Sequence, residues 1–161
     1  MGLESANYVL YSSKIGAPEL ERIIQNLGGH ENPDASAGTR KFIIQGERYW
    51  IDLLWLVESQ TGKPAIFIRV ALCNPLDVSE HLKKLLEELF RSGGEVMTDT
   101  RSKLQWSEWN DKSWDQLWVS YQRQQADFRQ SFGNYEAAIS ADEVFENLRK
   151  LSGSESKPGD V

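Results

Sequence analysis

The chain has 161 residues, of which 40% are hydrophobic and 26% are charged, a composition typical of one globular domain with its own core. Its formal net charge of −6 disfavours binding to the phosphates of nucleic acids. Cys73 is the only cysteine, so no intramolecular disulfide can form, and no apolar run approaches the roughly 20 residues of a membrane span. Because the first residues also lack the features of a signal peptide, we expect a cytoplasmic protein without a membrane or nucleic-acid partner.

The N-terminal part predicts a strand, a helix and a loop. Residues 7–12 are rich in strand-forming side chains. The helix starts near Pro18 and ends at Gly28-Gly29, and its apolar residues recur at helical spacing: Leu20, Ile23, Ile24 and Leu27. The polar residues 30–38 then predict a loop.

Three strands follow, over residues 39–44, 47–58 and 63–73. The first two form a hairpin around Gln45-Gly46, and a two-residue turn there pairs Ile44 with Glu47 and Phe42 with Tyr49.

The register of the last two strands follows from the parity of their apolar positions. A loop over residues 59–62 places the apolar sets on one face and brings Glu58 opposite Lys63 and Asp52 opposite Arg69. The residues expected to face the helices are Tyr49, Ile51, Leu53, Trp55, Ile66, Ile68 and Val70. The other face carries Ile43, Trp50, Leu54 and Phe67, which is too apolar for open solvent, so the rest of the chain or a partner should cover it.

The remaining chain predicts helices, each with a capping box at its start. The first opens at Asp77 with Glu80, carries Val78, Leu82, Leu85, Leu86, Leu89 and Phe90, and ends at Gly93-Gly94. Residues 95–104 have a weaker strand pattern. Boxes at Ser113 with Gln116 and at Ser140 with Glu143 open two further helices, and the apolar stripe of the first of these is Trp114, Leu117, Trp118, Tyr121, Phe128 and Phe132.

These elements predict a single α+β domain over residues 1–151. Its core, residues 1–105, is an antiparallel sheet of about four strands with two helices on one face, broadly ferredoxin-like in layout. A Trp-rich helical extension covers residues 106–151, and residues 152–161 form a tail without an apolar pattern that we expect to be disordered.

No combination of residues predicts catalysis, a metal site or a cofactor site. Cys73 has no base at a spacing that forces contact, and His30 and His81 are not clustered with other metal-binding residues. Asp52 and Arg69 fit a cross-strand ion pair better than a catalytic acid held by a cation.

The strongest binding signal lies just before the long C-terminal helix. Trp106 and Trp109 stand among the acids Glu108, Asp111 and Asp115, and these five residues are the predicted partner-binding site. Aromatic anchors inside an acidic rim suit a basic protein partner. The two tryptophans fit equally well as a cover for the sheet.

Residues 132–145, with the sequence FGNYEAAISADEVF, resemble C-terminal segments of bacterial immunity proteins, and the chain is similar to that class in being small, acidic and Trp-rich. The resemblance implies a non-enzymatic protein that binds and neutralises a toxin domain in the cytoplasm, such as a basic nuclease. The alternative is a small-molecule-binding or enzymatic domain with its site between the sheet and the C-terminal helices. A deep cleft holding Asp52, Arg69, Cys73 or His81 would favour that alternative.

Overall fold

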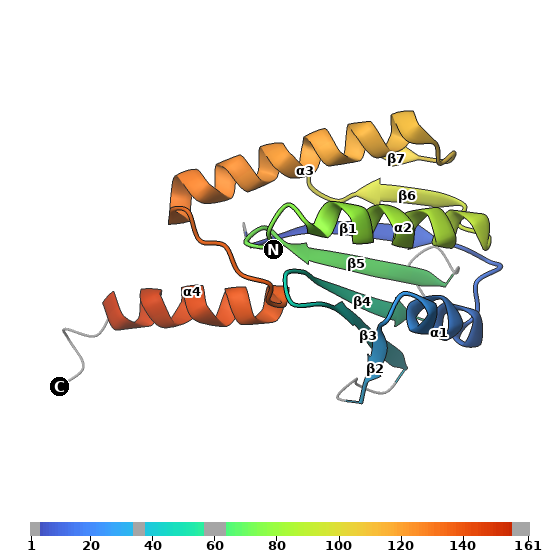
Figure 1. Ribbon diagram of the computed structural model, residues 1–161, viewed down its shortest axis with the longest axis horizontal. Helices are drawn as coiled ribbons and strands as arrows, with labels where there is room; N and C mark the ends of the chain where they lie inside the picture. The colour runs from blue at the N-terminus through green and yellow to red at the C-terminus, as the bar shows by residue number, and fades with distance from the viewer. Residues whose placement is uncertain (1–3, 34–37, 57–63, 156–161) are drawn as a thin grey trace.

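The computed structural model describes residues 4–33, 38–56 and 64–155, which form one antiparallel sheet and four helices (Figure 1). The strands are β1 (Ser5–Tyr11), β2 (His30–Asn32), β3 (Thr39–Gln45), β4 (Trp50–Leu56), β5 (Ala65–Ala71), β6 (Val96–Asp99) and β7 (Gln105–Trp106). The helices are α1 (Ala17–Asn26), α2 (Val78–Arg91), α3 (Asp111–Phe132) and α4 (Ala141–Glu155). The predicted α+β class is therefore confirmed.

The sheet has the spatial order β2-β3-β4-β5-β1-β6-β7, so the expected number of about four strands is too low. The additional strands are β2, β6 and β7, and all are short. β6 lies within the weak strand pattern of residues 95–104, and β2 occupies the start of the segment predicted as a loop. Short strands at both edges of the sheet limit unwanted pairing with other chains.

The expected ferredoxin-like layout is not confirmed. β1 lies between β5 and β6 and is antiparallel to both. β5 and β6, the strands that α2 joins, are therefore parallel with β1 between them, which is one split βαβ unit. α1, however, leads from β1 to β2 at the far edge of the sheet, with three strands between the two, so the described residues do not form the second such unit of a ferredoxin-like layout.

The predicted register between β4 and β5 is confirmed, because Asp52 lies directly opposite Arg69. Glu58 and Lys63, the second predicted charge pair, lie outside the described residues. Ile51 and Leu53 are buried on the face that packs against the helices, while Trp55 is partly buried against the same core.

The predicted hairpin register is wrong. Ile44 lies opposite Ile51 and Phe42 opposite Leu53, so the turn contains four residues, 46–49, rather than two. The reason is Tyr49, whose ring lies against Gly46 and stacks on His81 of α2 at 3.5 Å between centroids. This packing keeps Tyr49 out of the paired part of the strand. The register differs from the predicted one by an even number of residues, so every strand residue still points to the face that was predicted for it.

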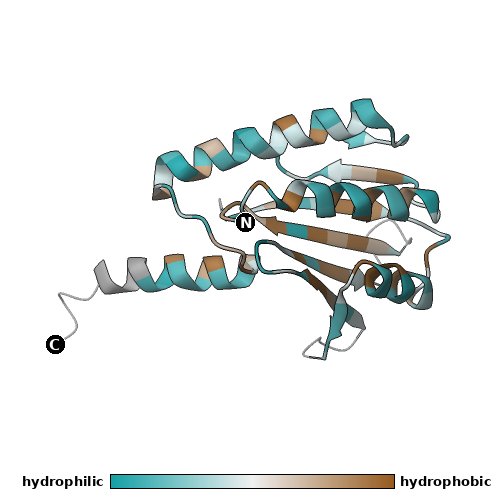
Figure 2. Cartoon of the chain, in the orientation of Figure 1, coloured by the Kyte–Doolittle hydropathy of each residue, from teal (hydrophilic) through white to brown (hydrophobic). Residues whose placement is uncertain are grey.

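The main core lies between the sheet and α1, α2 and α3. Figure 2 shows hydrophobic residues concentrated in the central strands, while the helices carry polar residues over much of their surface. Burial of each large aliphatic side chain contributes about 1.5–3 kcal/mol. The fully buried set on this face includes Tyr8, Leu10, Phe42, Ile44, Ile51, Ile66, Ile68 and Val70 from the strands, and Leu20, Ile23, Ile24, Leu82, Leu85, Leu86 and Leu89 from the helices.

The predicted packing of α3 onto the domain is confirmed. Trp114, Tyr121 and Phe128 are buried, and the indole of Trp118 is partly buried in a stack between Trp114 and Tyr121. The Tyr121 hydroxyl donates a hydrogen bond to the Ala71 carbonyl at the end of β5 (3.1 Å).

A buried carboxylate at the end of β6 also holds α3 in place. Asp99 is fully buried and accepts hydrogen bonds from Ser120 and Gln124 of α3, both at 3.1 Å. Its other oxygen accepts from the backbone N–H groups of Arg101 and Ser102. Four hydrogen bonds offset much of the free-energy cost of burying this charge.

The opposite face of the sheet receives the start of α4, which partly confirms the expected cover. The Ala141 backbone N–H donates to the carboxylate of Asp52 (3.1 Å), and Arg69 pairs with Asp142 (3.0 Å). Leu54 and Phe67 on this face stay half-buried.

One of the three predicted capping boxes is present. Ser140 and Glu143 bond each other's backbone N–H groups at the start of α4, as predicted. At α2, Asp77 makes no capping hydrogen bond, because the carbonyls of the preceding turn accept from the first helical N–H groups. α3 begins three residues earlier than predicted, with Asn110 as its N-cap and Ser113 as the reciprocal partner.

Candidate functional site

The two tryptophans of the predicted partner-binding site pack against the domain. Trp106 is 5% exposed, and its indole N–H donates to the Gln116 side chain (3.0 Å). Trp109 is half-buried, stacked on Phe90 of α2 at 5.1 Å and in edge contact with Trp106. Burial therefore favours the cover interpretation for Trp106, while one side of Trp109 lines a shallow surface hollow.

The three acids of the same predicted site are exposed. Glu108 lies in the loop before α3, and Asp111 and Asp115 lie in its first two turns. The Asp111 side chain is 98% exposed and reaches Lys83 of α2 only at 4.0 Å, the limit for an ion pair. These carboxylates are free to face an incoming partner, and their role in binding stays a prediction.

The residues proposed for an enzymatic alternative do not share a deep cleft. Asp52 and Arg69 line a hollow of about 80 Å³ on the open face of the sheet. Burial raises the pKa of the Asp52 carboxyl, an effect opposed by hydrogen bonds from Trp50 and Ala141 and by the charge of Arg69. Both residues are thus occupied in holding α4.

Cys73 and His81 lie elsewhere. Cys73 is fully buried, and burial raises the pKa of its thiol to about 11, so a reactive thiolate is suppressed. His81 stacks on Tyr49, and burial lowers the pKa of its imidazole. No group of three or more His, Cys, Asp or Glu residues that could hold a metal ion occurs among the residues that the structure describes.

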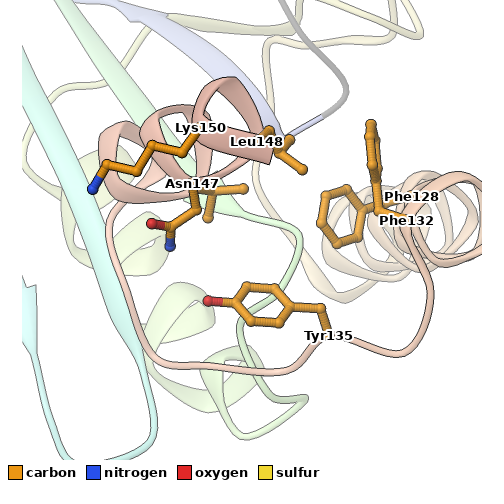
Figure 3. A pocket seen from close by; sticks show the side chains of 7 residues that line it. Phe128, Phe132, Tyr135, Asn147, Leu148 and Lys150 are labelled. Carbon is orange, nitrogen blue, oxygen red and sulfur yellow. The ribbon is translucent and has the colours of Figure 1, made fainter. Parts of the chain in front are cut away.

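A larger hollow, which the sequence did not predict, lies between the end of α3 and α4 (Figure 3). We call it the α3–α4 groove. It has a volume of about 430 Å³ and is lined by Phe128, Phe132, Tyr135, Val144, Asn147, Leu148 and Lys150. In Figure 3 the phenylalanines of α3 and Leu148 of α4 border the space from opposite sides, and Tyr135 borders it from the connecting segment.

The segment between the two helices, residues 133–140, keeps the groove open. Gly133 ends α3 with a φ of +84°, a conformation that favours glycine, so the chain turns away from the helix axis. The Ala137 N–H then donates to the Cys73 carbonyl (2.7 Å), and Asn74 donates to the Ile139 carbonyl (3.4 Å). These bonds carry the chain around the end of the sheet, so α4 starts on the opposite face and α3 projects beyond it.

Two of the exposed aromatic side chains of the described residues line the groove, and a third lies nearby in the sequence of α4. Phe132 and Tyr135 line it with 43% and 41% of their surfaces exposed, and Phe145 on α4 is 50% exposed. Exposed aromatic side chains around a concave site are typical of protein-binding surfaces. The sequence did contain one indication of this groove. The apolar stripe of α3 continues to Phe132, a position past the part of the helix that packs on the sheet.

None of the helices within the described residues is long and apolar enough to cross a membrane. The chain matches no protein-family model, no curated protein and no solved structure.

Proposed function

We propose that this chain is a non-enzymatic protein-binding domain that acts as an immunity protein: it binds a toxin domain in the cytoplasm and neutralises it. The observation that carries the proposal is the α3–α4 groove. An open hollow of about 430 Å³ with aromatic and aliphatic walls can receive the apolar anchor residues of a protein partner. The ionisable side chains that line it are those of Tyr135 and Lys150, which is a poor set for acid–base chemistry.

Two further features support the proposal. The segment that resembles immunity proteins, residues 132–145, supplies Phe132, Tyr135 and Val144 to the groove. The net charge of −6 and the exposed acids beside Trp109 favour a basic partner, because opposite charges speed association. A basic nuclease is one kind of toxin that fits.

The small-molecule alternative is less well supported at the position where we expected it. The hollow at Asp52 and Arg69 measures about 80 Å³, well below the roughly 300–1,000 Å³ of typical ligand pockets, whereas the α3–α4 groove, at about 430 Å³, lies within that range. A small molecule that binds this chain would therefore be expected at the groove and not at Asp52.

The proposal is tested by coexpression with the product of the neighbouring gene, which in an immunity locus encodes the toxin. Cells should survive when the chain is present and die without it, and the two purified proteins should form a complex. The double variant Phe132→Ser with Tyr135→Ser should protect less well, because both side chains line the groove and are already exposed. Val119→Ser is the matched control, since Val119 is 54% exposed on α3 and does not line the groove. A neighbouring product that neither harms cells nor binds the chain would contradict the proposal.

A further inference from the structure

The α3–α4 groove adjoins a second, more polar hollow along α4. The second hollow has a volume of about 400 Å³ and shares Tyr135, Asn147 and Lys150 with the groove. Its other lining residues are Ile139, Asp142, Glu143 and Glu146. An apolar site and an acidic site therefore lie side by side on one helix.

The three acids keep free acceptor capacity. Asp142 pairs with Arg69 through one oxygen (3.0 Å), and its side chain remains 70% exposed. Glu146 pairs with Arg149 in the next turn (2.9 Å), and its side chain remains 47% exposed. Glu143 is exposed and uses one oxygen to cap Ser140. Each carboxylate can thus accept a further hydrogen bond from a cation of a partner.

We propose that the groove and this acidic hollow together bind a cationic amphipathic segment of the protein partner. Apolar side chains of that segment fill the space between Phe132 and Leu148, while its Lys or Arg side chains lie over Asp142 and Glu146. The inference rests on the proposed function and deepens it, since it names the chemistry of the partner segment and its binding site.

The charge pattern distinguishes this occupant from the two others that an apolar groove can take. A second copy of the chain would bring another net charge of −6 toward the same acids, which is unfavourable. A small apolar ligand could fill the groove but would make no use of the free acceptor capacity of the acids beside it, which already pair with Arg69 and Arg149 on one side only.

The test uses two synthetic peptides of about five helical turns. Both carry Leu and Trp at helical spacing on one face, and the remaining positions are Lys in one peptide and Glu in the other. The full chain should bind the Lys peptide at least about tenfold more tightly than the Glu peptide in a calorimetric titration at moderate salt.

Matched variants locate the binding. Glu146→Lys should lower the affinity for the Lys peptide about tenfold, whereas Glu88→Lys should change this affinity by less than about twofold. Glu88 is a matched control because it too pairs with an arginine three residues later in its helix, Arg91. Phe132→Ser should lower the affinity for the Lys peptide, whereas Val119→Ser should leave this affinity unchanged.

Each contrary result overturns a distinct part. Equal affinity for the two peptides would show that the bound segment need not be cationic. Equal effects of Glu146→Lys and Glu88→Lys would show that the acids of α4 do not bind it. A wild-type dimer that Phe132→Ser dissociates shows that the occupant is a second copy, and an apolar molecule that copurifies with wild type but not with Phe132→Ser shows a ligand site. Survival in the coexpression assay decides the proposed function independently of all these results.

Discussion

At the scale of single residues, Cys73 shows how burial separates a structural side chain from a functional one. The thiol is fully buried, and its pKa of about 11 lies well above that of a free cysteine. At about pH 8 this shift lowers the thiolate population about a hundredfold. Alkylation of the native protein should therefore be slower than that of the urea-unfolded chain by at least this factor, and it should accelerate as the pH rises. Equal rates in a time course followed by mass spectrometry would show that Cys73 is accessible.

Asp52 is the residue whose environment most directly links pH to the C-terminal helix. Its folded pKa is raised, chiefly by burial, so the folded state binds the proton more tightly than the unfolded state. The contribution of Asp52 to stability is therefore greatest below the ordinary carboxyl pKa, and it falls as the pH rises through the raised folded value.

Asp52→Asn removes this titration. The free energy of unfolding of wild type minus that of the variant should fall as the pH rises from below the ordinary aspartate pKa through the raised one, and it should be constant at higher pH. Urea denaturation across the acid range measures this difference. A difference that grows with pH would mean that the hydrogen bonds from Trp50 and Ala141 outweigh burial.

At the scale of elements, the tryptophans of α3 have graded roles. Trp114 is 9% exposed in the core, whereas Trp118 is only partly buried between its stacking partners. Trp114→Ala should cost roughly 3–5 kcal/mol in the free energy of unfolding, and Trp118→Ala about 1–3 kcal/mol. Urea denaturation of both variants tests this order. If Trp114→Ala matched wild type, α3 would not pack on the domain through this face.

Local sequence patterns predicted the elements whose information lies within a few residues. The parity of apolar positions and the charges of Asp52 and Arg69 determine the β4–β5 register, because a slip by one position would expose the whole core face. The box of Ser140 and Glu143 likewise depends on residues three positions apart.

Elements that depend on distant contacts could not be predicted in this way. β2 contains the polar residues His30–Asn32, and it is a strand because β3 pairs with it. The hairpin turn is longer than predicted because Tyr49 stacks on His81, a residue of α2 that lies far along the chain. The α3–α4 groove depends on the path of residues 133–140, which is set by bonds to Cys73 and Asn74 and not by any local pattern.

At the scale of the whole molecule, the C-terminal helices α3 and α4 lie on opposite faces of the sheet, and a partner can contact both where their ends approach each other. α1, α2 and α3 pack on one face, and α4 begins on the other, so the groove opens at the end of the sheet where the chain passes between the faces (Figure 1). The acids Glu108, Asp111 and Asp115 lie at the opposite end of α3 from Phe132. We therefore expect this acidic cluster to act on the approach of a basic partner rather than on its final contact with the groove.

Reversal of the two charges in α3 tests this role in approach. Asp111→Lys with Asp115→Lys should leave the fold largely intact, since both side chains are exposed and the loss of negative charge at a helix start costs about 0.3–1 kcal/mol per residue. The association rate with the neighbouring gene's product should fall, and it should fall more at low ionic strength than at high, because salt screens long-range attraction. The dissociation rate should change little if, as we propose, the contacts that determine affinity lie at the groove.

The matched control makes the same change in net charge on another helix. Glu19→Lys with Glu21→Lys reverses two carboxylates near the start of α1. If the acidic cluster steers the partner, stopped-flow mixing at two salt concentrations should give a slower association for the α3 variant than for the α1 variant. Equal slowing would assign steering to net charge alone, and unchanged association in both would remove long-range electrostatic steering from recognition, leaving the short-range contacts at the groove and at the acidic hollow of α4.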